Sequence, residues 1–378
     1  MRLLGLAIVP TVTDRLAQLV VVIGGLVLLW GAANLVVSLA TATALGLLLM
    51  RLYKHTGPTS VPSAPVTSPR GSSTPGPRGR LTARQLLGGL TIAALGAAAV
   101  GGALLHGVGI EDHATVMAHR GASAAAPENT LAAVERAIRD GADWVEIDVQ
   151  ETLDGEVVVL HDSDLMKVAG VDAKIWDLPY AELRAIDVGS HFAAEFRDQR
   201  VPRLEEVLRL CKDRIGVNIE LKYYGHDQRL EERVIEIVEA TGMSSDVVIM
   251  SLKHDAIATV RRLRPDWRVG LLTAVTLGDL TRMDVDFLAV HTRLATAAFV
   301  RTAHRRGKDV YACTVNDKVS MSRMISRGVD ALITDEPARA RDLLAERTGL
   351  SAVERLLVEL ALWFGVQPTE ADVEAETR

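Results

Sequence analysis

Residues 144–149 read Trp-Val-Glu-Ile-Asp-Val, and this stretch decides the fold of the C-terminal part of the chain. Residues two apart on a β-strand face the same side, so Glu146 and Asp148 point together while aliphatic side chains cover the opposite face. Two carboxylates on a packed inner face are costly unless a metal ion or cations compensate them. The stretch therefore indicates a buried strand with a functional inner face, although a charged strand facing solvent is the alternative for one such pair.

Seven further short runs rich in apolar residues also resemble β-strands, with helical stretches between them. The strands are expected at Val116–His119, Gly216–Leu221, Val247–Ser251, Val269–Leu272, Phe287–Val290, Val310–Thr314 and Ala331–Thr334. The helices include Leu131–Arg139, Arg229–Glu239, Ala256–Arg264, Thr296–Arg306, Val319–Ser326 and Ala338–Ala345. Eight strands with helical crossovers over about 230 residues predict an α/β fold, a parallel (β/α)8 TIM barrel rather than an open sheet.

The segment from Gln150 to Cys211 has a looser pattern. A β-hairpin is expected at Asp154 and Gly155, a turn-forming pair between two short runs. Long connections commonly carry functional groups. We therefore expect an insertion over the barrel mouth that shapes the substrate site.

The chain before residue 111 has a different composition. Residues 16–50 hold no charged residue, which predicts an N-terminal transmembrane region of one or two spans over residues 1–50. A second uncharged run predicts a transmembrane helix over residues 85–110, with an Ala-rich soluble helix as the alternative. Residues 51–84 form a basic linker rich in Pro, Ser and Gly. A cleaved signal peptide is disfavoured because the apolar run continues past the small residues at 40–42.

The basic linker also predicts the topology. It carries six Lys and Arg residues and no Asp or Glu, and such loops stay on the cytoplasmic side of a membrane. We therefore expect a protein of the cell membrane, multi-pass or bitopic, with its barrel domain at residues 111–348 outside the cytoplasm. Residues 349–378 are expected to form an amphipathic helix and an acidic tail.

The charge and cysteine content limit the partners. The formal net charge is -6, so no overall basic field holds a polyanion, and nucleic acid is not an expected partner. Cys211 and Cys313 are the only cysteines, too few for a disulfide framework or a zinc-type cluster. The oligomeric state stays open.

Glu220 and Lys222 repeat the two-apart arrangement on the next long strand. Glu220 offers a third carboxylate beside Glu146 and Asp148. Three oxygen ligands with room for water suit Mg²⁺ or Ca²⁺ better than zinc. The sequence therefore predicts a divalent metal ion as cofactor.

Two histidines follow candidate strands, where barrel enzymes place catalytic groups. His119 ends the first strand and precedes Arg120, whose planar donor fork suits a phosphoryl oxygen. His161 follows the second half of the expected hairpin. Two histidines can share the proton transfers of phosphodiester cleavage, one assisting the nucleophile and one protonating the leaving alkoxide. A lone histidine is more often structural, so the co-occurrence with the carboxylates supports the role.

Eight ordered motifs resemble the signature of the glycerophosphodiester phosphodiesterase family. They are His119-Arg120-Gly121, Pro127-Glu128-Asn129-Thr130, Glu146-Ile147-Asp148, Asp154-Gly155, His161-Asp162, Pro202-Arg203-Leu204-Glu205, Glu220-Leu221-Lys222 and Thr334-Asp335-Glu336-Pro337. The resemblance covers residues 116–344 and implies a barrel that hydrolyses glycerophosphodiesters to glycerol 3-phosphate and an alcohol.

The resemblance also implies a role for each matching side chain. Glu146, Asp148 and Glu220 would bind the divalent metal. His119 and His161 would be the acid/base pair, and Arg120 and Lys222 would hold the phosphate. Glu128 and Asn129 are expected to begin the helix after Pro127 and to support the pocket.

Two positions depart from the family pattern. Cys313 stands where the family often has Trp, and Leu252 where it often has Phe. Both changes remove aromatic surface on which a leaving group could pack, which weakens the case for choline esters. Two other functions stay open: a phospholipase D-type hydrolase or lyase acting on lysophospholipids, and a non-catalytic membrane-tethered binding protein.

Overall fold

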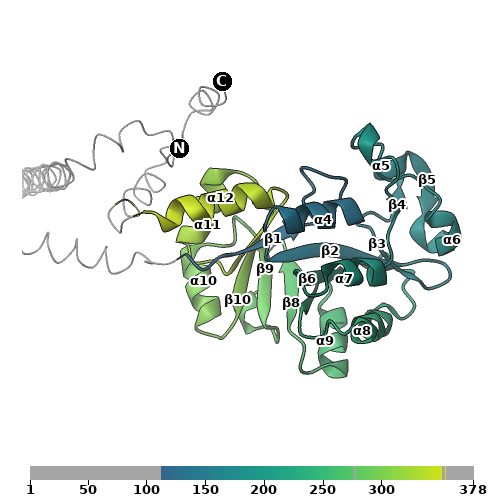
Figure 1. Ribbon diagram of the computed structural model, residues 1–378. Helices are drawn as coiled ribbons and strands as arrows, with labels where there is room; N and C mark the ends of the chain where they lie inside the picture. Colours follow the sequence, from purple (N-terminus) through teal and green to yellow (C-terminus); the bar gives the residue numbers. More distant parts are fainter. Residues whose placement is uncertain (1–111, 276–277, 351–353, 355–378) are drawn as a thin grey trace, which may run out of the picture. The chain divides into compact units, whose positions relative to one another are not determined.

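Eight parallel strands close into a barrel in the computed structural model, which describes residues 112–275, 278–350 and 354 (Figure 1). They are β1 (Thr115–His119), β2 (Trp144–Glu151), β6 (Gly216–Leu221), β7 (Val247–Ser251), β8 (Val269–Thr273), β9 (Phe287–His291), β10 (Asp309–Cys313) and β11 (Ala331–Thr334). Each strand pairs in parallel with the next, and β1 pairs with both β2 and β11, which closes the ring. The predicted TIM barrel is confirmed.

Helices follow most of the barrel strands. They are α4 (Leu131–Arg139), α7 (Leu204–Cys211), α8 (Leu230–Thr241), α9 (His254–Leu263), α10 (Ala297–His304), α11 (Lys318–Ser326) and α12 (Pro337–Thr348). All six helices expected from the sequence are present with small shifts at their ends. Helix α7 was not expected, although its buried residues Leu204, Val207, Leu208 and Cys211 follow helical spacing. Between β8 and β9 lies the short 3-10 helix η5 (Leu280–Arg282).

The barrel interior changes from apolar to charged toward the carboxyl ends of the strands. Its apolar part holds Met117, Val248, Met250, Phe287, Ala289, Tyr311, Ala331 and Ile333. The ring of Phe287 needs a glycine at position 270, because a Cβ there would lie 2.1 Å from a ring carbon. Two residues further along β1 and β2, the same inner faces carry His119 and Glu146, which are register partners. The charged groups therefore stand above an apolar floor.

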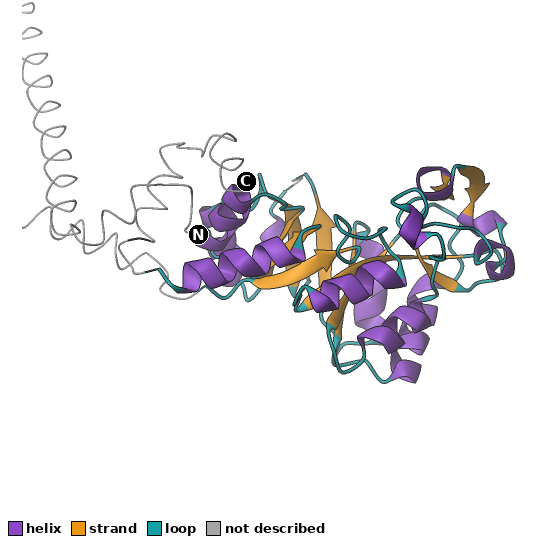
Figure 2. Ribbon diagram, turned by 45° about the horizontal axis from the view of Figure 1, so that its top comes forward, coloured by secondary structure: helices purple, strands orange, loops and turns teal. Residues whose placement is uncertain are grey.

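The expected insertion lies between β2 and α7 and is confirmed. Its elements are β3 (Val157–Val159), β4 (Asp164–Leu165), α5 (Met166–Ala169), β5 (Val171–Lys174), η3 (Ile175–Asp177), α6 (Tyr180–Leu183) and η4 (Ala194–Phe196). Strand β3 runs antiparallel to β2 after a turn at Asp154 and Gly155, where Gly155 has a φ of 78°. Most of the insertion forms a lobe beyond the end of β2, with a small hydrophobic core of its own (Figures 1 and 2).

The predicted N-terminal spans at 1–50 and 85–110, the linker at 51–84 and most of the C-terminal segment at 349–378 lie outside the described residues. Among the residues that the structure does describe, no helix is both long and apolar enough to cross a membrane. The two cysteines are free, with Cys211 buried on α7 and Cys313 partly buried at the end of β10.

Candidate active site

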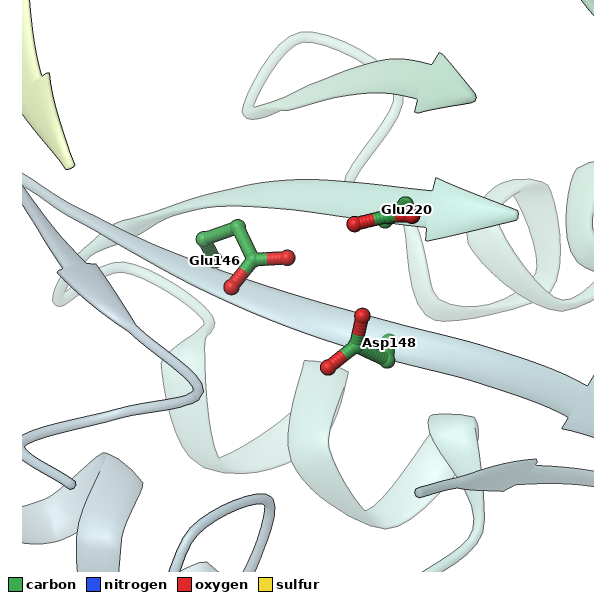
Figure 3. A group of neighbouring side chains, drawn as sticks. All are labelled: Glu146, Asp148 and Glu220. Atoms are coloured by element: carbon green, nitrogen blue, oxygen red, sulfur yellow. The ribbon is translucent and has the colours of Figure 1, made fainter. Parts of the chain in front are cut away.

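Three carboxylates meet inside the barrel near its mouth: Glu146 and Asp148 from β2, and Glu220 from β6 (Figure 3). Register explains the meeting, because Asp148 and Glu220 are direct neighbours across the two strands. One oxygen of each residue lies within 4.8 Å of an oxygen of the other two. All three side chains are buried, so the sequence-predicted trio forms one compact acidic cluster.

The electrostatics of the cluster fit a divalent cation. Burial, followed by the charges of Asp148 and Glu220, raises the pKa of Glu146 well above its usual range. Burial and then Asp148 raise the pKa of Glu220 to about 7. For Asp148, burial is outweighed by Lys222 and Arg120, which lower its pKa. Glu146 Oε1 is buried without a hydrogen-bond partner. An orphaned oxygen beside two further carboxylates matches the oxygen coordination that Mg²⁺ or Ca²⁺ prefers.

Arg120 links the cluster to the pocket beside it. Its backbone has a φ of 55°, in the left-handed region that is strained for a residue with a side chain. Its backbone N–H donates to Glu146 Oε2 at 3.0 Å. Its guanidinium donates to Glu128 Oε1 at 3.0 Å and lies 3.3 Å from Asp148 Oδ2. The next residue, Gly121, lies so close to Ala133 that a Cβ would be 2.6 Å from its backbone carbon.

Asn129 and Lys222 complete the surroundings of Asp148. The Asn129 side chain donates to Asp148 Oδ2 at 2.9 Å and accepts from the Asp148 backbone N–H at 3.3 Å. Lys222 Nζ lies 2.9 Å from Glu220 Oε1 and 3.6 Å from Asp148 Oδ1. Asn129 therefore fixes the Asp148 carboxylate from the segment before helix α4. Helix α4 begins at Leu131 as expected, with Thr130 as its N-cap, so Glu128 and Asn129 lie just before the helix.

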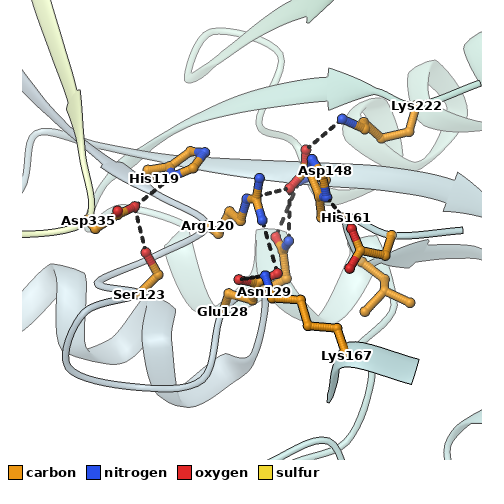
Figure 4. A network of polar contacts seen from close by, with 12 residues as sticks. His119, Arg120, Ser123, Glu128, Asn129, Asp148, His161, Lys167, Lys222 and Asp335 are labelled. Carbon is orange, nitrogen blue, oxygen red and sulfur yellow. Dashed lines mark hydrogen bonds and ion pairs between the residues drawn. The ribbon is translucent and has the colours of Figure 1, made fainter. Parts of the chain in front are cut away.

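The two histidines are each held through Nδ1 by an aspartate (Figure 4). His119 Nδ1 lies 2.6 Å from Asp335 Oδ1, and His161 Nδ1 lies 2.6 Å from Asp162 Oδ1. For His161, burial together with Lys222 and Arg120 lowers the pKa against the opposing charge of Asp148. Both histidines are partly accessible, so each imidazole is oriented from one side and open on the other.

A polar pocket opens beside His119. The residues that line it are His119, Arg120, Ser123, Ala124, Glu128, Lys167, Asn316, Asp335 and Glu336. Lys167 comes from α5 of the insertion and lies 2.6 Å from Glu128, the same carboxylate that receives Arg120. The insertion therefore contributes directly to the wall of the site, as its position in the sequence predicts.

The structure also adds residues that the sequence did not single out. Trp176 of the insertion stacks on His226, with ring centroids 4.2 Å apart, and lies 6.0 Å from Tyr224. The Tyr224 hydroxyl donates to the backbone carbonyl of His161. No local motif marks these residues, because the insertion must fold over the barrel before they meet. Aromatic surface is thus supplied near His161.

The two departures from the family pattern have different environments. Leu252 follows β7 and is 59% exposed. Cys313 lies close enough to the cluster that burial, and then the charges of Glu146 and Glu220, raise the pKa of its thiol to about 12. The thiol is therefore neutral at physiological pH and adds no charge to the site.

Fold and site together define an α/β barrel with a buried acidic cluster beside two histidines that are each hydrogen-bonded to an aspartate. The profile of the glycerophosphoryl diester phosphodiesterase family matches residues 119–339, and the chain belongs to this family. The chain is accordingly a phosphoric diester hydrolase, and the non-catalytic alternative loses its support.

Individual relatives agree with this result. The chain is 34% identical to a glycerophosphodiester phosphodiesterase of Caldanaerobacter subterraneus subsp. tengcongensis, over 59% of this chain and 94% of the relative. It is 32% identical to one from Bacillus altitudinis, over 60% of this chain and 96% of the relative. Among solved structures it is similar to an Oleispira antarctica phosphodiesterase in complex with the product sn-glycerol-3-phosphate. That similarity has a TM-score of 0.57 and 30% identity, and covers 61% of this chain and 96% of the other.

Proposed function

We propose that the barrel domain hydrolyses glycerophosphodiesters to glycerol 3-phosphate and an alcohol, with a divalent metal ion held by Glu146, Asp148 and Glu220. The observation that carries the proposal is the buried carboxylate trio at the barrel mouth, with one oxygen unpartnered. The product bound in the Oleispira antarctica structure supports the choice of substrate.

The residues around the trio have separate tasks in this proposal. When bound, the metal ion would neutralise phosphate charge and could lower the pKa of a bound nucleophile. Arg120 and Lys222 bind the phosphoryl oxygens, because both cations border the carboxylate cluster and a charged donor forms strong hydrogen bonds with phosphate. They stabilise charge that grows in the transition state.

His119 and His161 move the protons. A carboxylate can only accept hydrogen bonds, so each aspartate requires a proton on the Nδ1 atom that faces it. This leaves Nε2 of each ring as the atom that exchanges protons. One histidine takes a proton from the nucleophile, and the other gives a proton to the oxygen of the leaving alcohol. The nucleophile is either water or the glycerol hydroxyl beside the phosphate; in the second route water then opens a cyclic phosphate to give glycerol 3-phosphate.

A substrate panel tests this proposal. The purified 378-residue chain is depleted of metal, restored with Mg²⁺ or Ca²⁺, and assayed for glycerol 3-phosphate released from glycerophosphodiesters of choline, ethanolamine and glycerol. We expect release only after restoration, and loss of release in Glu146→Gln and His161→Ala. Full activity in the metal-depleted protein, or in either variant, would remove these residues from their assigned roles.

Lysophospholipids are a second candidate substrate class, because exposed apolar side chains occur in segments that follow the carboxyl ends of barrel strands. The exposed large hydrophobic residues of the described chain are Leu153, Met166, Val171, Phe192, Leu252 and Val275. All of them lie in segments that follow the carboxyl end of a barrel strand, which is the face that carries active sites in this fold. Lysophospholipids assayed beside the soluble diesters test this class, and Leu252→Ser should lower only the rate on the acylated substrates.

We also propose that uncharged segments before residue 111 anchor the chain in the cell membrane, with the barrel domain outside the cytoplasm. The support is the hydropathy of residues 16–50 and 85–109 and the basic linker between them. A reporter fused after Arg378 tests the orientation. Periplasmic or extracellular reporter activity is expected, and a cytoplasmic signal would reverse the topology.

A further inference from the structure

We propose that Asp335 is a positioning residue that holds His119 in the tautomer able to accept a proton at Nε2. The inference deepens the proposed function, because it rests on His119 being one of the two proton-transfer groups. It concerns a residue of the Thr334-Asp335-Glu336-Pro337 motif to which the sequence attached no task.

Closure of the barrel creates the contact between the two residues. Ala118 on β1 is the register partner of Thr334 on β11, so the next residues, His119 and Asp335, leave the two neighbouring strands side by side. They are separated by 216 positions in the chain, yet His119 Nδ1 and Asp335 Oδ1 lie 2.6 Å apart. The contact is shown in Figure 4 beside Ser123.

Three donors hold the carboxylate of Asp335 in one orientation. Oδ1 accepts from the His119 ring and from the Ser123 hydroxyl at 2.9 Å, and Oδ2 accepts from the Asn316 amide at 2.6 Å. Burial opposes ionisation, but the hydrogen bonds from His119, Ser123 and Asn316 outweigh it and lower the pKa of Asp335 to about 2. Asp335 is therefore a charged acceptor at neutral pH.

The amide of Asn316 is itself fixed. Its Oδ1 accepts from the Asp335 backbone N–H at 2.9 Å and from the Thr334 hydroxyl at 3.2 Å. Turning the amide over would lose both bonds, so its N–H₂ group must face Asp335 Oδ2. Because the Asn316 amide cannot turn over, it limits how an asparagine at position 335 could orient its own amide.

An asparagine at position 335 would have to place its own N–H₂ group on one of two sides. Facing Asn316, it would set donor against donor. Facing His119, it would donate to Nδ1, and the neutral ring would then carry its proton on Nε2. The second arrangement keeps the hydrogen-bond network but gives His119 the tautomer that cannot accept a proton at Nε2. The expected loss in kcat is about 100- to 10,000-fold, with little change in KM.

A matched control exists away from the site. His304 Nε2 lies 2.7 Å from Asp330 Oδ2, a histidine and aspartate pair of the same kind. Asp330 precedes β11, whereas Asp335 follows it, so the control pair lies at the opposite end of the strand. Asp330→Asn removes the charge of a comparable pair and should leave kcat and KM unchanged.

The experiment combines kinetics with imidazole ¹⁵N NMR on the 378-residue chain, with the His119 signals assigned by their loss in His119→Gln. We expect Nδ1–H for neutral His119 in the wild type, Nε2–H in Asp335→Asn, and Nδ1–H again in Asp335→Glu together with partial recovery of kcat. Nε2–H in the wild type would overturn the inference without any variant. So would Asp335→Asn with an unchanged tautomer and wild-type kcat.

The two proposals fail in different ways. If the wild type releases no glycerol 3-phosphate from any diester, the proposed function fails, while the ring signals still report whether Asp335 sets the tautomer. If activity is present but Asp335→Asn loses no more of it than Asp330→Asn, the proposed function stands and the positioning role of Asp335 is refuted.

Discussion

Replacing Glu146 by glutamine should make the metal-free protein more stable while removing its response to metal. Two unit charges 4.8 Å apart, the upper limit for the separation of the cluster oxygens, repel by about 3.5 kcal/mol at an effective dielectric constant of about 20. Glu146 faces two such neighbours, Asp148 and Glu220. The positive charge of Arg120, whose backbone N–H also bonds Glu146, offsets much of this repulsion.

We expect the net gain in the free energy of unfolding of metal-free Glu146→Gln to be about 1–2 kcal/mol, because protonation relieves part of the repulsion in the wild type. For a domain of this size the gain corresponds to a rise in Tm of about 2–8 °C. At a metal concentration of about 100 Kd the wild type gains about 2.7 kcal/mol. The variant lacks one of three ligands and should gain only a small fraction of that.

Differential scanning calorimetry with EDTA and with added Mg²⁺ or Ca²⁺ measures both effects. Glu151→Gln is the matched control, because Glu151 is a buried glutamate on the same strand but is paired with Arg233 at 2.6 Å. The control should lose about 1–3 kcal/mol and keep the wild-type response to metal. The reasoning is refuted if metal-free Glu146→Gln is destabilised like the control, or if its Tm still rises with metal as in the wild type.

Three further changes test other parts of the structure. Tyr224→Phe removes the hydroxyl that donates a hydrogen bond to the His161 carbonyl. Because this hydrogen bond is worth about 1 kcal/mol, kcat should fall several-fold while Tm falls by only a few degrees. An unchanged kcat would show that Tyr224 does not help to place His161. Arg347→Met breaks the buried bidentate pair with Asp112, and chemical denaturation should show a loss of about 3–5 kcal/mol in the free energy of unfolding. A loss under about 1 kcal/mol would mean that the pair contributes no more than an exposed ion pair. The folded-state pKa of Asp335 lies below its unfolded value, so its stabilising effect is complete above the unfolded pKa and disappears as pH falls toward about 2. The Tm difference between wild type and Asp335→Asn should therefore narrow below about pH 4. A difference that stays constant with pH would mean that the substitution acts through packing and not through the carboxylate charge.

Strand positions could be predicted well because each barrel strand is a short apolar run between helical stretches. The trio of carboxylates could be predicted equally well, since a spacing of two residues along β2 and β6 places the charges on one face. Helix α7 was missed although its apolar residues keep helical spacing. Its first residues form part of a motif, and the irregular insertion before it hides where the crossover begins.

Contacts between distant segments could not be predicted. The bond between His119 and Asp335 depends on which strands meet when the barrel closes, and no property of either motif encodes that partner. The contacts of Lys167, Trp176 and Tyr224 depend in the same way on how the insertion folds over the mouth. Local pattern thus identified the chemical groups, while the three-dimensional arrangement identified what orients them.

The residues proposed to bind the metal ion are synthesised before the residue proposed to orient His119. The three carboxylates sit on β2 and β6, in the first part of the barrel sequence, whereas Asp335 follows β11, the last strand to leave the ribosome. A chain interrupted before β11 would retain the three carboxylates proposed to hold the metal ion, but would lack Asp335, which we propose orients His119. Under these proposals a truncated chain would carry the metal ligands without hydrolysing substrate. Hydrolysis would then require the complete ring of barrel strands.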